Sequence, residues 1–466
     1  MKSILTTLTT VLRFEVLAVM HFFVKEFIGN LSHSIHLHTL PIPPAGSRIL
    51  LFIPHPDDEI AACCTFISKA IKTGCFLKTV MITNGDGVGL ADYIKYKLTK
   101  PKPKYFEKMA YIRQKETKAA LTSLGLTEDN IIFLGYPDRC SLNLWRNNWD
   151  PDKPFTSPYT KCNRSPYTNS YKIGAAYTGS SLVNDIEEIT KKFNPTHIIY
   201  PHFYDCHVDH FSANNFVKYI IAKTGIAAVE LTYLVHRGHW PTPPGRFKTL
   251  GLTPPRSLDG CGIEWFSLPL SANDIREKGK RLHFYKSQSI INRVYLLSFL
   301  RKNELFGQYR DIDVYVNEIM QNGAETIHID NPCSDTIRGY LHKSADISGL
   351  TITIRRDSME CTMGTVNRPG KNYQYIFDLI FFEVNKTIKR CVISIDNGIL
   401  RSNKATMDCI DSLDRQIVYS IGDYYVKITL CCQDLNNINA IFVNAVTRMG
   451  DILIDRTGSR LIKLRH

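Results

Sequence analysis

The sequence predicts an α/β domain with a mostly parallel sheet flanked by helices, followed by a C-terminal all-β domain. Two observations favour this order. From Ser47 to about residue 235, short apolar runs alternate with amphipathic stretches, a rhythm typical of a parallel sheet covered by helices. After about residue 320, runs rich in Val, Ile, Thr and Tyr follow one another with little helical pattern between them, which favours antiparallel strands.

The predicted strands of the first domain are apolar throughout, as expected for strands that are buried on both faces. They are the runs RILLFIP, LKTVMITN, NIIFLGYP, THIIYPH and AAVELTYLV. Amphipathic stretches at 57–73, 108–125, 180–193 and 210–223 predict the helices between them. In such a Rossmann-like sheet, ligands bind at the carboxyl ends of the strands. The residues directly after each run are therefore the candidates for function.

Other segments complete the predicted organisation. Residues 139–178 are rich in Asn, Pro, Ser and aromatic residues, and they are too long for an idle connection. Helical character returns at 271–302. The runs TIHID, LTITIRR, YIFDLIFFEV, CVISID, YYVKITLCC and AIFVNAV predict a sandwich-like domain. We therefore expect an apolar or amphipathic segment at 1–45, an α/β domain at 46–315 and a β-rich domain at 320–466.

The composition is that of a globular protein. Of the 466 residues, 44% are hydrophobic and 22% are charged, which excludes a mostly disordered chain, a collagen-like fibre and a coiled-coil rod. The 13 cysteines include no CxxC pair, so they predict buried free thiols rather than a disulfide framework. Free thiols favour a reducing compartment, and we expect a cytoplasmic protein.

The charge is positive and unevenly distributed. The formal net charge is +13; residues 321–466 hold 18 Lys and Arg against 16 Asp and Glu, which leaves +11 for residues 1–320. This excess suits an anionic partner such as a phosphate, an acidic glycan or a membrane surface. No sequence motif of nucleic-acid binding occurs, so no nucleic acid is expected. Residues 1–30 are apolar but interrupted by charges, which predicts an amphipathic helix packed on the body or a peripheral membrane contact.

Two clusters of polar residues follow predicted strands. The first strand ends in Pro-His-Pro-Asp-Asp-Glu at 54–59, and the fourth in Tyr-Asp-Cys-His-Val-Asp-His at 204–210. Either cluster alone could simply cap a helix. Because the carboxyl ends of parallel strands lie at one edge of the sheet, both clusters can meet in one crevice. Two imidazoles and a carboxylate with an open position are a normal catalytic zinc set.

These clusters belong to an ordered series of motifs: PHPDDE at 54–59, TNGDG at 83–87, RQKE at 113–116, LGYPD at 134–138, HVDH at 207–210 and YKSQ at 285–288. With this series, residues 47–310 resemble the PIG-L/LmbE-like family of zinc-dependent N-acetylglucosaminyl de-N-acetylases. The resemblance implies that His55, Asp58 and His210 bind Zn²⁺ and that Asp57 is the general base for the attacking water.

The resemblance also implies roles for other residues. Protonated His207 would stabilise the oxyanion, and Asp209 would hold the His207 ring and raise its basicity. Arg113 and Asp138 resemble positions near the sugar or its aglycone. The sequence departs from the family at Val208, where proline is usual, and at Asp205, where some members have a tyrosine. Tyr204, one residue earlier, is therefore the candidate for contact with the substrate carbonyl.

The sequence thus predicts a zinc-dependent hydrolase that removes an acetyl group from an N-acetylated amino sugar or glycoconjugate. The lysine-rich segment at 95–108 is either an ordinary solvated loop or a surface beside the crevice that attracts an anionic group of the substrate. One alternative is a zinc amidase or deacylase that acts on another N-acyl metabolite. A second alternative is a non-catalytic carbohydrate-binding protein on the same scaffold.

Overall fold

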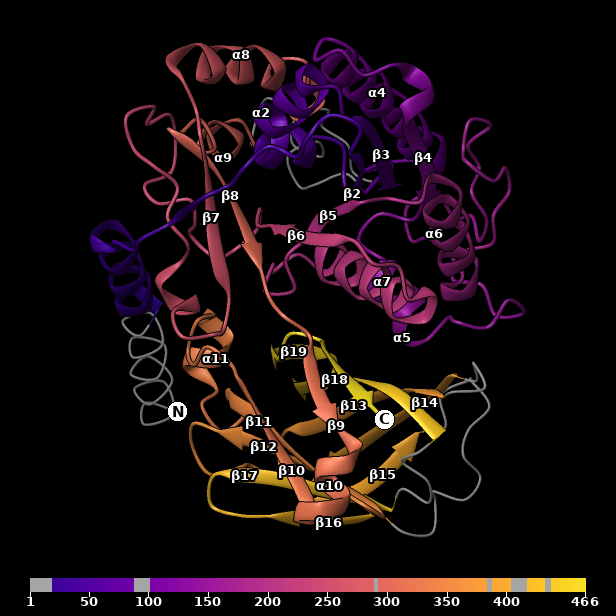
Figure 1. Cartoon of the computed structure of the whole chain (residues 1–466), viewed down its shortest axis with the longest axis vertical. Helices are drawn as coiled ribbons and strands as arrows, with labels where there is room; N and C mark the ends of the chain where they lie inside the picture. The colour runs from indigo at the N-terminus through magenta and orange to yellow at the C-terminus, as the bar shows by residue number, and fades with distance from the viewer. Residues whose placement is uncertain (1–18, 88–100, 289–291, 384–387, 404–416, 432–436) are drawn as a thin grey trace, which may run out of the picture. The chain divides into compact units, whose positions relative to one another are not determined.

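The computed structural model of the protein describes residues 19–87, 101–288, 292–383, 388–403, 417–431 and 437–466 (Figure 1). The chain divides into two compact units. The α/β unit comprises Ser34–Pro254 and Glu264–Gln308, and the β unit comprises Met1–His33, Pro255–Ile263 and Tyr309–His466. Residues 255–263 thus lie inside the predicted α/β stretch in sequence but belong to the β unit. The predicted domain boundaries remain predictions.

A mostly parallel sheet forms the centre of the α/β unit, as predicted. Its strand order is β1-β7-β8-β6-β5-β2-β3-β4. Neighbouring strands from β6 to β4 all run parallel. The predicted strands are β2 (Arg48–Ile53), β3 (Phe76–Thr83), β4 (Ile131–Tyr136), β5 (His197–Pro201) and β6 (Val229–Tyr233).

The other edge of this sheet was not apparent in the sequence pattern. β7 (Glu264–Pro269) and β8 (Asn303–Gln308) pair antiparallel, β8 also pairs antiparallel with β6, and β1 (His38–Thr39) pairs parallel with β7. β8 is buried over most of its length although it begins with Asn303 and Glu304. These polar residues interrupt the apolar run by which a buried strand is normally predicted.

Helices cover both faces of the sheet. The four predicted stretches correspond to α2 (Asp58–Thr73), α4 (Pro103–Thr122), α6 (Gly179–Phe193) and α7 (Val208–Thr224). α2 packs against α8, and α5 and α6 pack against α7; Figure 1 shows these groups on opposite sides of the sheet. The remaining helical elements are α5 (Ser141–Arg146), α8 (Ala272–Leu282), α9 (Arg293–Leu297), η1 (Glu128–Asn130) and η3 (Lys286–Gln288).

The strand order places the two predicted clusters next to each other. β2 and β5 are neighbouring parallel strands, and the chain order along the sheet reverses between them. In open α/β sheets, ligands bind outside the carboxyl ends of the strands at such a reversal. The residues that follow β2 and β5 are those of the first and second cluster, respectively.

The β unit contains two antiparallel sheets around one core. Their orders are β10-β11-β12-β17-β16 and β15-β14-β13-β18-β20-β9, with β19 paired to β18 and β9 parallel to β20. Side chains from both sheets, such as Ile352 and Leu379, share one buried apolar cluster. The strands are β9 (Ile312–Tyr315), β10 (Ala324–Asp330), β11 (Ile347–Arg355), β12 (Ser358–Thr365), β13 (Gln374–Glu383), β14 (Ile388–Asp396), β15 (Ile399–Asn403), β16 (Val418–Ile421), β17 (Tyr425–Cys431), β18 (Ile438–Met449), β19 (Ile452–Arg456) and β20 (Arg460–Arg465). Short helices are η2 (Arg256–Leu258), α10 (Val316–Asn322) and α11 (Ile337–Leu341).

An N-terminal helix occurs in the segment that was expected to be apolar or amphipathic. It spans residues 19–32 of the described chain, and its buried Phe22 packs against Tyr340 of α11, with 5.5 Å between the ring centroids. Exposed apolar side chains lie at Met20, Phe23, Val24, Phe27, Ile28 and Leu31. Residues 1–18 of the predicted membrane contact at 1–30 are outside the described part. Among the helices that the structure describes, none is both long and apolar enough to cross a bilayer.

Candidate functional site

Three side chains converge at the carboxyl ends of β2 and β5. His55 Nδ1 lies 3.4 Å and His210 Nε2 lies 3.0 Å from Asp58 Oδ2. All three side chains are buried. His55 lies between β2 and α2, Asp58 begins α2, and His210 lies in the first turn of α7. The structure therefore brings together the three predicted metal ligands, although His210 is more than 150 residues from the other two in sequence.

The start of α2 is conformationally unusual. Asp57 is its N-cap residue and has φ 114°, a value that residues with a Cβ rarely adopt. The Glu59 carboxylate accepts a hydrogen bond from the Asp57 main-chain N–H at 2.9 Å, and the Asp57 carbonyl accepts from Ile60 and Ala61. Strained residues persist where surrounding contacts over-determine them, and such residues cluster at active sites.

Arg113 holds the predicted general base. Its guanidinium donates to the Pro56 carbonyl at 2.6 Å and to the Gly85 carbonyl at 2.9 Å, and it lies 3.4 Å from Asp57 Oδ2. Gly85 has φ +62°, and a Cβ there would lie 2.1 Å from Arg113 Nη1, so the TNGDG motif needs a glycine at this position. Burial raises the pKa of Asp57 well above its usual value, although the charge of Arg113 opposes this.

The second ring nitrogen of His55 faces two carboxylates. His55 Nε2 lies 3.0 Å from Asp209 Oδ2 and 3.1 Å from Asp138 Oδ1. Burial alone would lower the pKa of His55, but Asp138 and the hydrogen bonds with its neighbours raise it well above the usual value. Asp138, predicted near the sugar, thus also orients a predicted ligand. A carboxylate on the far nitrogen of a metal-binding histidine fixes its tautomer and its ring orientation.

The structure corrects the predicted relation between Asp209 and His207. The Asp209 carboxylate does not hold the His207 ring; it binds His55 and accepts from the Arg139 and Ser141 main-chain N–H groups and from the Ser141 hydroxyl. Only the main-chain N–H of Asp209 meets His207, donating to its Nδ1 at 3.2 Å. The reason is local, because His207 is the N-cap of α7 and its ring serves as the capping acceptor.

This capping geometry also bears on the charge of His207. Because Nδ1 accepts a hydrogen bond, the proton of the neutral ring is on Nε2. Burial lowers the pKa of His207 to about 2, and the neighbouring His55 contributes in the same direction. This environment favours the neutral ring, which can donate a hydrogen bond from Nε2, and the predicted role of protonated His207 remains a prediction.

Sequence reasoning missed the roles of Asp205 and His236. Asp205 Oδ1 accepts from the His207 N–H at 2.9 Å, and Oδ2 accepts from Val235 and His236 N–H at 3.0 and 2.9 Å and lies 3.0 Å from His210 Nδ1. His236 lies next to the predicted ligands, and its ligand atom falls within 4.8 Å of those of His55, Asp58 and His210. The rule applied to the other strands, inspection of the residues after each run, would have found His236 after β6.

Tyr204 lies in the same loop but is packed among aromatic residues. Its side chain is buried, its ring is 4.4 Å from that of Phe203, and the Arg237 guanidinium lies 5.5 Å from the ring centroid. The Tyr204 carbonyl accepts a hydrogen bond from Arg237 at 2.8 Å. These contacts fix the ring in the loop that precedes His207, and its contact with substrate remains a prediction.

The other motif residues hold the scaffold of the site together. Asp86 accepts from the Asp138 N–H at 3.1 Å and from the Tyr167 hydroxyl at 2.7 Å, which ties the insertion at 139–178 to the end of β3. Tyr285 donates to Glu59. Ser287 donates to Glu116 through its N–H at 2.8 Å and its hydroxyl at 2.6 Å. The motifs at 113–116 and 285–288 therefore connect α4, the start of α2 and the segment after α8.

The donor atoms at the carboxyl ends of β2 and β5 fit a divalent transition-metal ion. Imidazole nitrogens with one carboxylate are the donors that zinc and similar ions prefer. His210 Nε2 is fully buried and makes no well-aligned hydrogen bond, although Asp58 lies 3.0 Å away. A buried polar atom of this kind calls for a partner. A cation that it shares with Asp58 would be such a partner.

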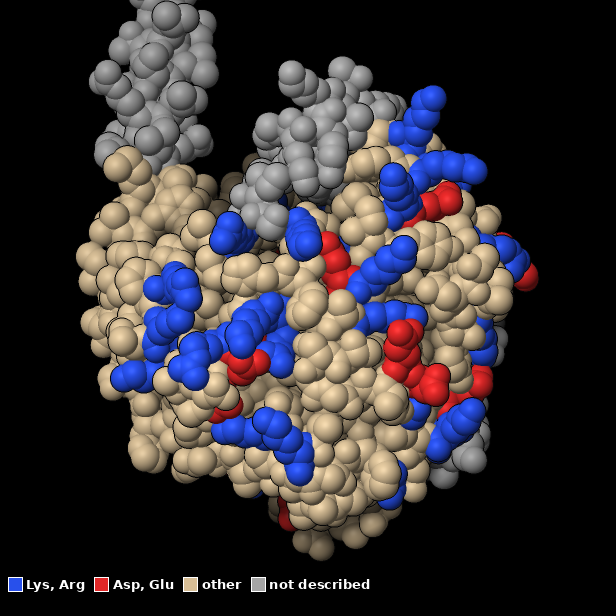
Figure 2. Space-filling view, turned by 90° about the horizontal axis from the view of Figure 1, so that it is seen from above, with Lys and Arg blue, Asp and Glu red and all other residues tan. Residues whose placement is uncertain are grey.

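The face of the α/β unit that carries α4 and α8 is basic. Figure 2 looks onto this face, and it shows Lys and Arg side chains spread over it with fewer acidic ones. Exposed lysines of α4 and of the residue before it include Lys102, Lys104 and Lys108. Lys95, Lys97 and Lys100 of the predicted lysine-rich segment are outside the described residues. An anionic substrate group near this face would be attracted by long-range electrostatics.

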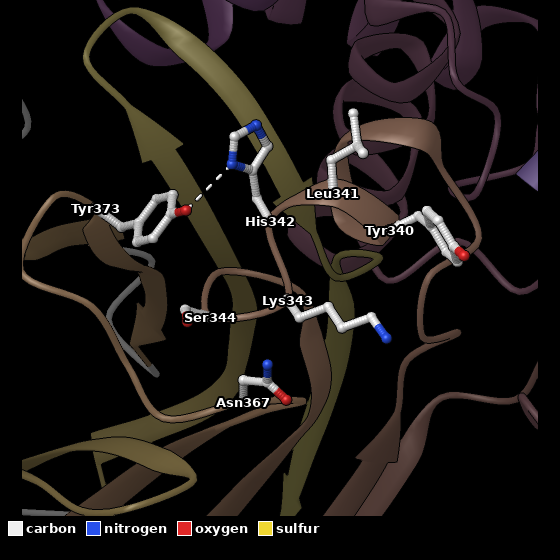
Figure 3. Close-up of a pocket in the computed structure, with 7 residues that line it drawn as sticks. All are labelled: Tyr340, Leu341, His342, Lys343, Ser344, Asn367 and Tyr373. Atoms are coloured by element: carbon white, nitrogen blue, oxygen red, sulfur yellow. Dashed lines mark hydrogen bonds between the residues drawn. The ribbon is translucent and has the colours of Figure 1, made fainter. Parts of the chain in front are cut away.

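The β unit contains a separate cavity of about 350 Å³. Figure 3 shows the seven side chains around it, with His342 Nδ1 3.1 Å from the Tyr373 hydroxyl. The lining residues are Tyr340, Leu341, His342, Lys343, Ser344, Asn367 and Tyr373. These include one imidazole and no acid, so the cavity lacks the paired acid and histidine groups that hydrolysis at the other site would use.

Comparison with known proteins supports the resemblance drawn from the motifs. Residues 50–221 match the family model described as PIG-L, GlcNAc-PI de-N-acetylase. No curated protein matches the sequence closely enough to count as a relative.

Several solved structures are similar in part of the chain. A deacetylase of teicoplanin biosynthesis has 15% identity and a TM-score of 0.37 over 56% of this chain and 97% of that chain. The N,N'-diacetylchitobiose deacetylase of Pyrococcus horikoshii has 16% identity and a TM-score of 0.33 over 55% and 82%. GalB of Pseudomonas putida, a 4-carboxy-2-hydroxymuconate hydratase, has 11% identity and a TM-score of 0.32 over 54% and 83%. Since these TM-scores are below 0.5, we base no conclusion on them.

The family match covers the site built above. It includes PHPDDE at 54–59 and HVDH at 207–210, and thus the predicted ligands and the predicted base. It confirms the resemblance and the class of enzyme that the resemblance implies, an N-deacetylase of the hydrolase type. Residues 50–221 of this chain are a PIG-L family domain.

Proposed function

We propose that the protein is a Zn²⁺-dependent hydrolase that removes the acetyl group from an N-acetylated amino sugar or glycoconjugate. One observation carries this proposal: His55, Asp58 and His210 meet beside Asp57 at the carboxyl ends of two neighbouring parallel strands. Two imidazoles and a carboxylate form a catalytic zinc set that leaves a position for water. The order β4-β3-β2-β5-β6 of the parallel strands supports describing the sheet as Rossmann-like.

Each residue of the site has a role in this reaction. Zn²⁺ held by His55, Asp58 and His210 would lower the pKa of water and polarise the acetamide carbonyl. Asp57 accepts a proton as the water oxygen adds to the carbonyl carbon. The raised pKa of Asp57 suits it to keep this proton and then give it to the amine nitrogen as the C–N bond breaks. The products are acetate and the free amine.

Arg113 and His207 act beside the base. Arg113 keeps Asp57 in place through its contacts with Asp57 and with the Pro56 carbonyl. Neutral His207, with its proton on Nε2, donates a hydrogen bond to the carbonyl oxygen as that oxygen becomes negative. Asp209 and Asp138 hold the His55 ring. Asp138, Arg113 and Tyr204 remain candidates for substrate contact at the rim of the site.

The substrate class rests on the family description and on charge. The description of the matched family model names GlcNAc-PI, an N-acetylglucosamine linked to phosphatidylinositol, as the substrate. In this chain, the first 320 residues carry most of the net positive charge. An N-acetylated sugar with an anionic aglycone would suit both observations. Exposed basic contacts are each worth little and are screened by salt, so they would affect KM more than the chemical step.

The test uses the purified full chain. Zinc content and acetate release are measured on a panel of N-acetyl sugars, neutral and anionic, and on N-acyl metabolites that are not sugars. Asp57→Asn is expected to keep zinc and to lose deacetylation by at least about a hundredfold, the scale of a general base. Asp185→Asn is the matched control, because Asp185 is a buried acid of the same unit that binds Tyr136 instead.

The outcomes separate the competing functions. Acetate release from sugars that depends on zinc and Asp57 supports the proposal. Cleavage of non-sugar amides alone would identify a different amidase. Sugar binding without acetate release from any substrate would identify a binding protein. Normal turnover by Asp57→Asn would exclude Asp57 as the base.

A further inference from the structure

His236 lies beside the predicted ligands but has no role in the function proposed above. Its ring centroid is 4.8 Å from that of His210, and its Nε2 is 3.9 Å from Asp58 Oδ1. Ligand atoms of His55, Asp58, His210 and His236 all lie within 4.8 Å of one another. We propose that His236 is a fourth protein ligand of the same metal, which would then be bound by three imidazoles and one carboxylate. This inference rests on the metal site of the proposed function.

The hydrogen bonds of Tyr295 determine which nitrogen of His236 is free to bind a metal. The Tyr295 hydroxyl is 2.5 Å from the Val235 carbonyl oxygen and 3.2 Å from His236 Nδ1. A carbonyl oxygen can only accept, and a hydroxyl has one proton, so Tyr295 donates to Val235. The contact with His236 must then be a hydrogen bond from Nδ1–H to the Tyr295 oxygen. In this neutral tautomer, Nε2 carries the lone pair on the side of Asp58.

Two further contacts fix the position of the ring. The main-chain N–H of His236 donates to Asp205 Oδ2 at 2.9 Å, and the same carboxylate lies 3.0 Å from His210 Nδ1. The His236 ring is also nearly parallel to the Tyr295 ring, at 5.4 Å and 7°. One buried acid therefore positions both His210 and His236, and the tyrosine limits rotation of the His236 side chain. Metal-binding histidines are typically oriented by such neighbouring groups.

The exposure of His236 agrees with a ligand at the open side of the site. Its side chain is 34% exposed, whereas those of His210 and Asp58 are 0% and 2% exposed. The three buried ligands would stay fixed at the sheet edge. His236 would then bind from the more exposed side of the site, and the attacking water would take a fifth position, a coordination number that catalytic zinc can reach. A nitrogen-rich set of this kind favours zinc and similar ions over Mg²⁺ or Ca²⁺, which prefer oxygen ligands.

The experiment measures zinc affinity without reference to activity. The metal-free full chain is titrated with Zn²⁺ in competition with a chromophoric chelator, and folding of each variant is checked by circular dichroism. His236→Ala and, as a second variant, His236→Gln are expected to weaken zinc binding by at least about tenfold, the lower end of the effect of even an outer-shell partner. His197→Ala should bind zinc as the wild type does, because His197 is at the opposite end of β5.

Tyr295 tests the tautomer argument. Tyr295→Phe is expected to weaken zinc binding less than His236→Ala does, and to add nothing in the double variant, because the hydroxyl acts through His236. An additional loss in the double variant would overturn this part of the argument. Wild-type affinity in folded His236→Ala and His236→Gln would overturn the proposal itself. A wild-type chain that binds no zinc would instead overturn the metal site of the proposed function.

Discussion

Replacement of Asp205 by Asn is expected to weaken zinc binding although Asp205 is not a predicted ligand. Both carboxylate oxygens act as acceptors, for main-chain N–H groups of His207, Val235 and His236 at 2.9–3.0 Å, and Oδ2 also faces His210 Nδ1 at 3.0 Å. An asparagine amide has one oxygen and one NH₂ group. In either orientation of the amide, the NH₂ group faces N–H groups from which a carboxylate oxygen accepted hydrogen bonds. Because an NH₂ group can only donate, those hydrogen bonds are lost.

The expected magnitude follows from these contacts. If Nδ2 replaces Oδ1, one main-chain hydrogen bond is lost; if it replaces Oδ2, two are lost together with the contact to His210. The smaller loss is expected, and a hydrogen bond to a charged group contributes about 1.5–3 kcal/mol. Loss of an outer-shell partner typically reduces metal affinity about 10- to 100-fold. We therefore expect zinc affinity to fall within that range, with the fold retained.

The assay is the chelator competition described for His236, with tryptophan fluorescence as the measure of folding. All four tryptophans, at 145, 149, 240 and 265, belong to the α/β unit, so fluorescence reports on the unit that carries the site. Asp185→Asn again serves as the control. A folded Asp205→Asn chain with wild-type zinc affinity would refute the reasoning, because it would show that His210 and His236 need no shared carboxylate.

Two further predictions concern stability and pH. Lys278→Met should destabilise the α/β unit by about 3–5 kcal/mol, because it leaves buried Glu304 without the cation 3.0 Å away. The free energy of unfolding is measured in denaturant titrations followed by tryptophan fluorescence. A loss below about 1 kcal/mol would contradict the prediction. Burial raises the pKa of Asp346 to about 6 from 3.8, so folding favours its protonated form. Stability from this group should be present at low pH and decline as pH rises through about 6. The main-chain amide protons of β11 should lose protection against hydrogen exchange from pH 5 to pH 7 in the wild type, and the loss should be smaller in Asp346→Asn. An equal loss in both chains would show that Asp346 does not cause the pH dependence.

Much of the α/β unit and its predicted metal ligands could be predicted because the signals are local. The runs that became β2 to β6 are apolar over several consecutive residues, and the acids and histidines stand directly after two of them. A parallel sheet then brings those strand ends together without any knowledge of side-chain contacts. The antiparallel edge could not be predicted in this way. β8 contains buried Glu304, whose charge is balanced by Lys278 from α8, a pairing that no local pattern reveals.

The errors at the site have a common cause. The resemblance implies that Asp209 holds the His207 ring. In the first turn of α7, however, the main-chain N–H of Asp209 faces the capping ring of His207, and its carboxylate is directed to His55. His236 was missed because it stands alone after its strand. Its position depends on contacts with Asp205 and Tyr295, which come from other segments. The partner of the Asp209 carboxylate and the position of His236 are therefore visible only in the hydrogen bonds of the folded chain.

The balance of buried charge supports a cation at this site independently of the family. Seven acids of the site are buried, and the Arg113 guanidinium lies 3.4 Å from one of them, Asp57. The seven are Asp57, Asp58, Asp86, Asp138, Asp205, Asp209 and Glu59. Burial raises the pKa of Glu59 and of Asp86 to about 7, which shows how costly further negative charge is here. His210, with its pKa raised to about 9 by Asp205 and Asp58 against the effect of burial, can supply a positive charge only by protonation. A divalent ion would take over that charge, release the proton from His210 and leave its Nε2 as a ligand. The same buried acids that disfavour further negative charge would therefore make metal binding strong.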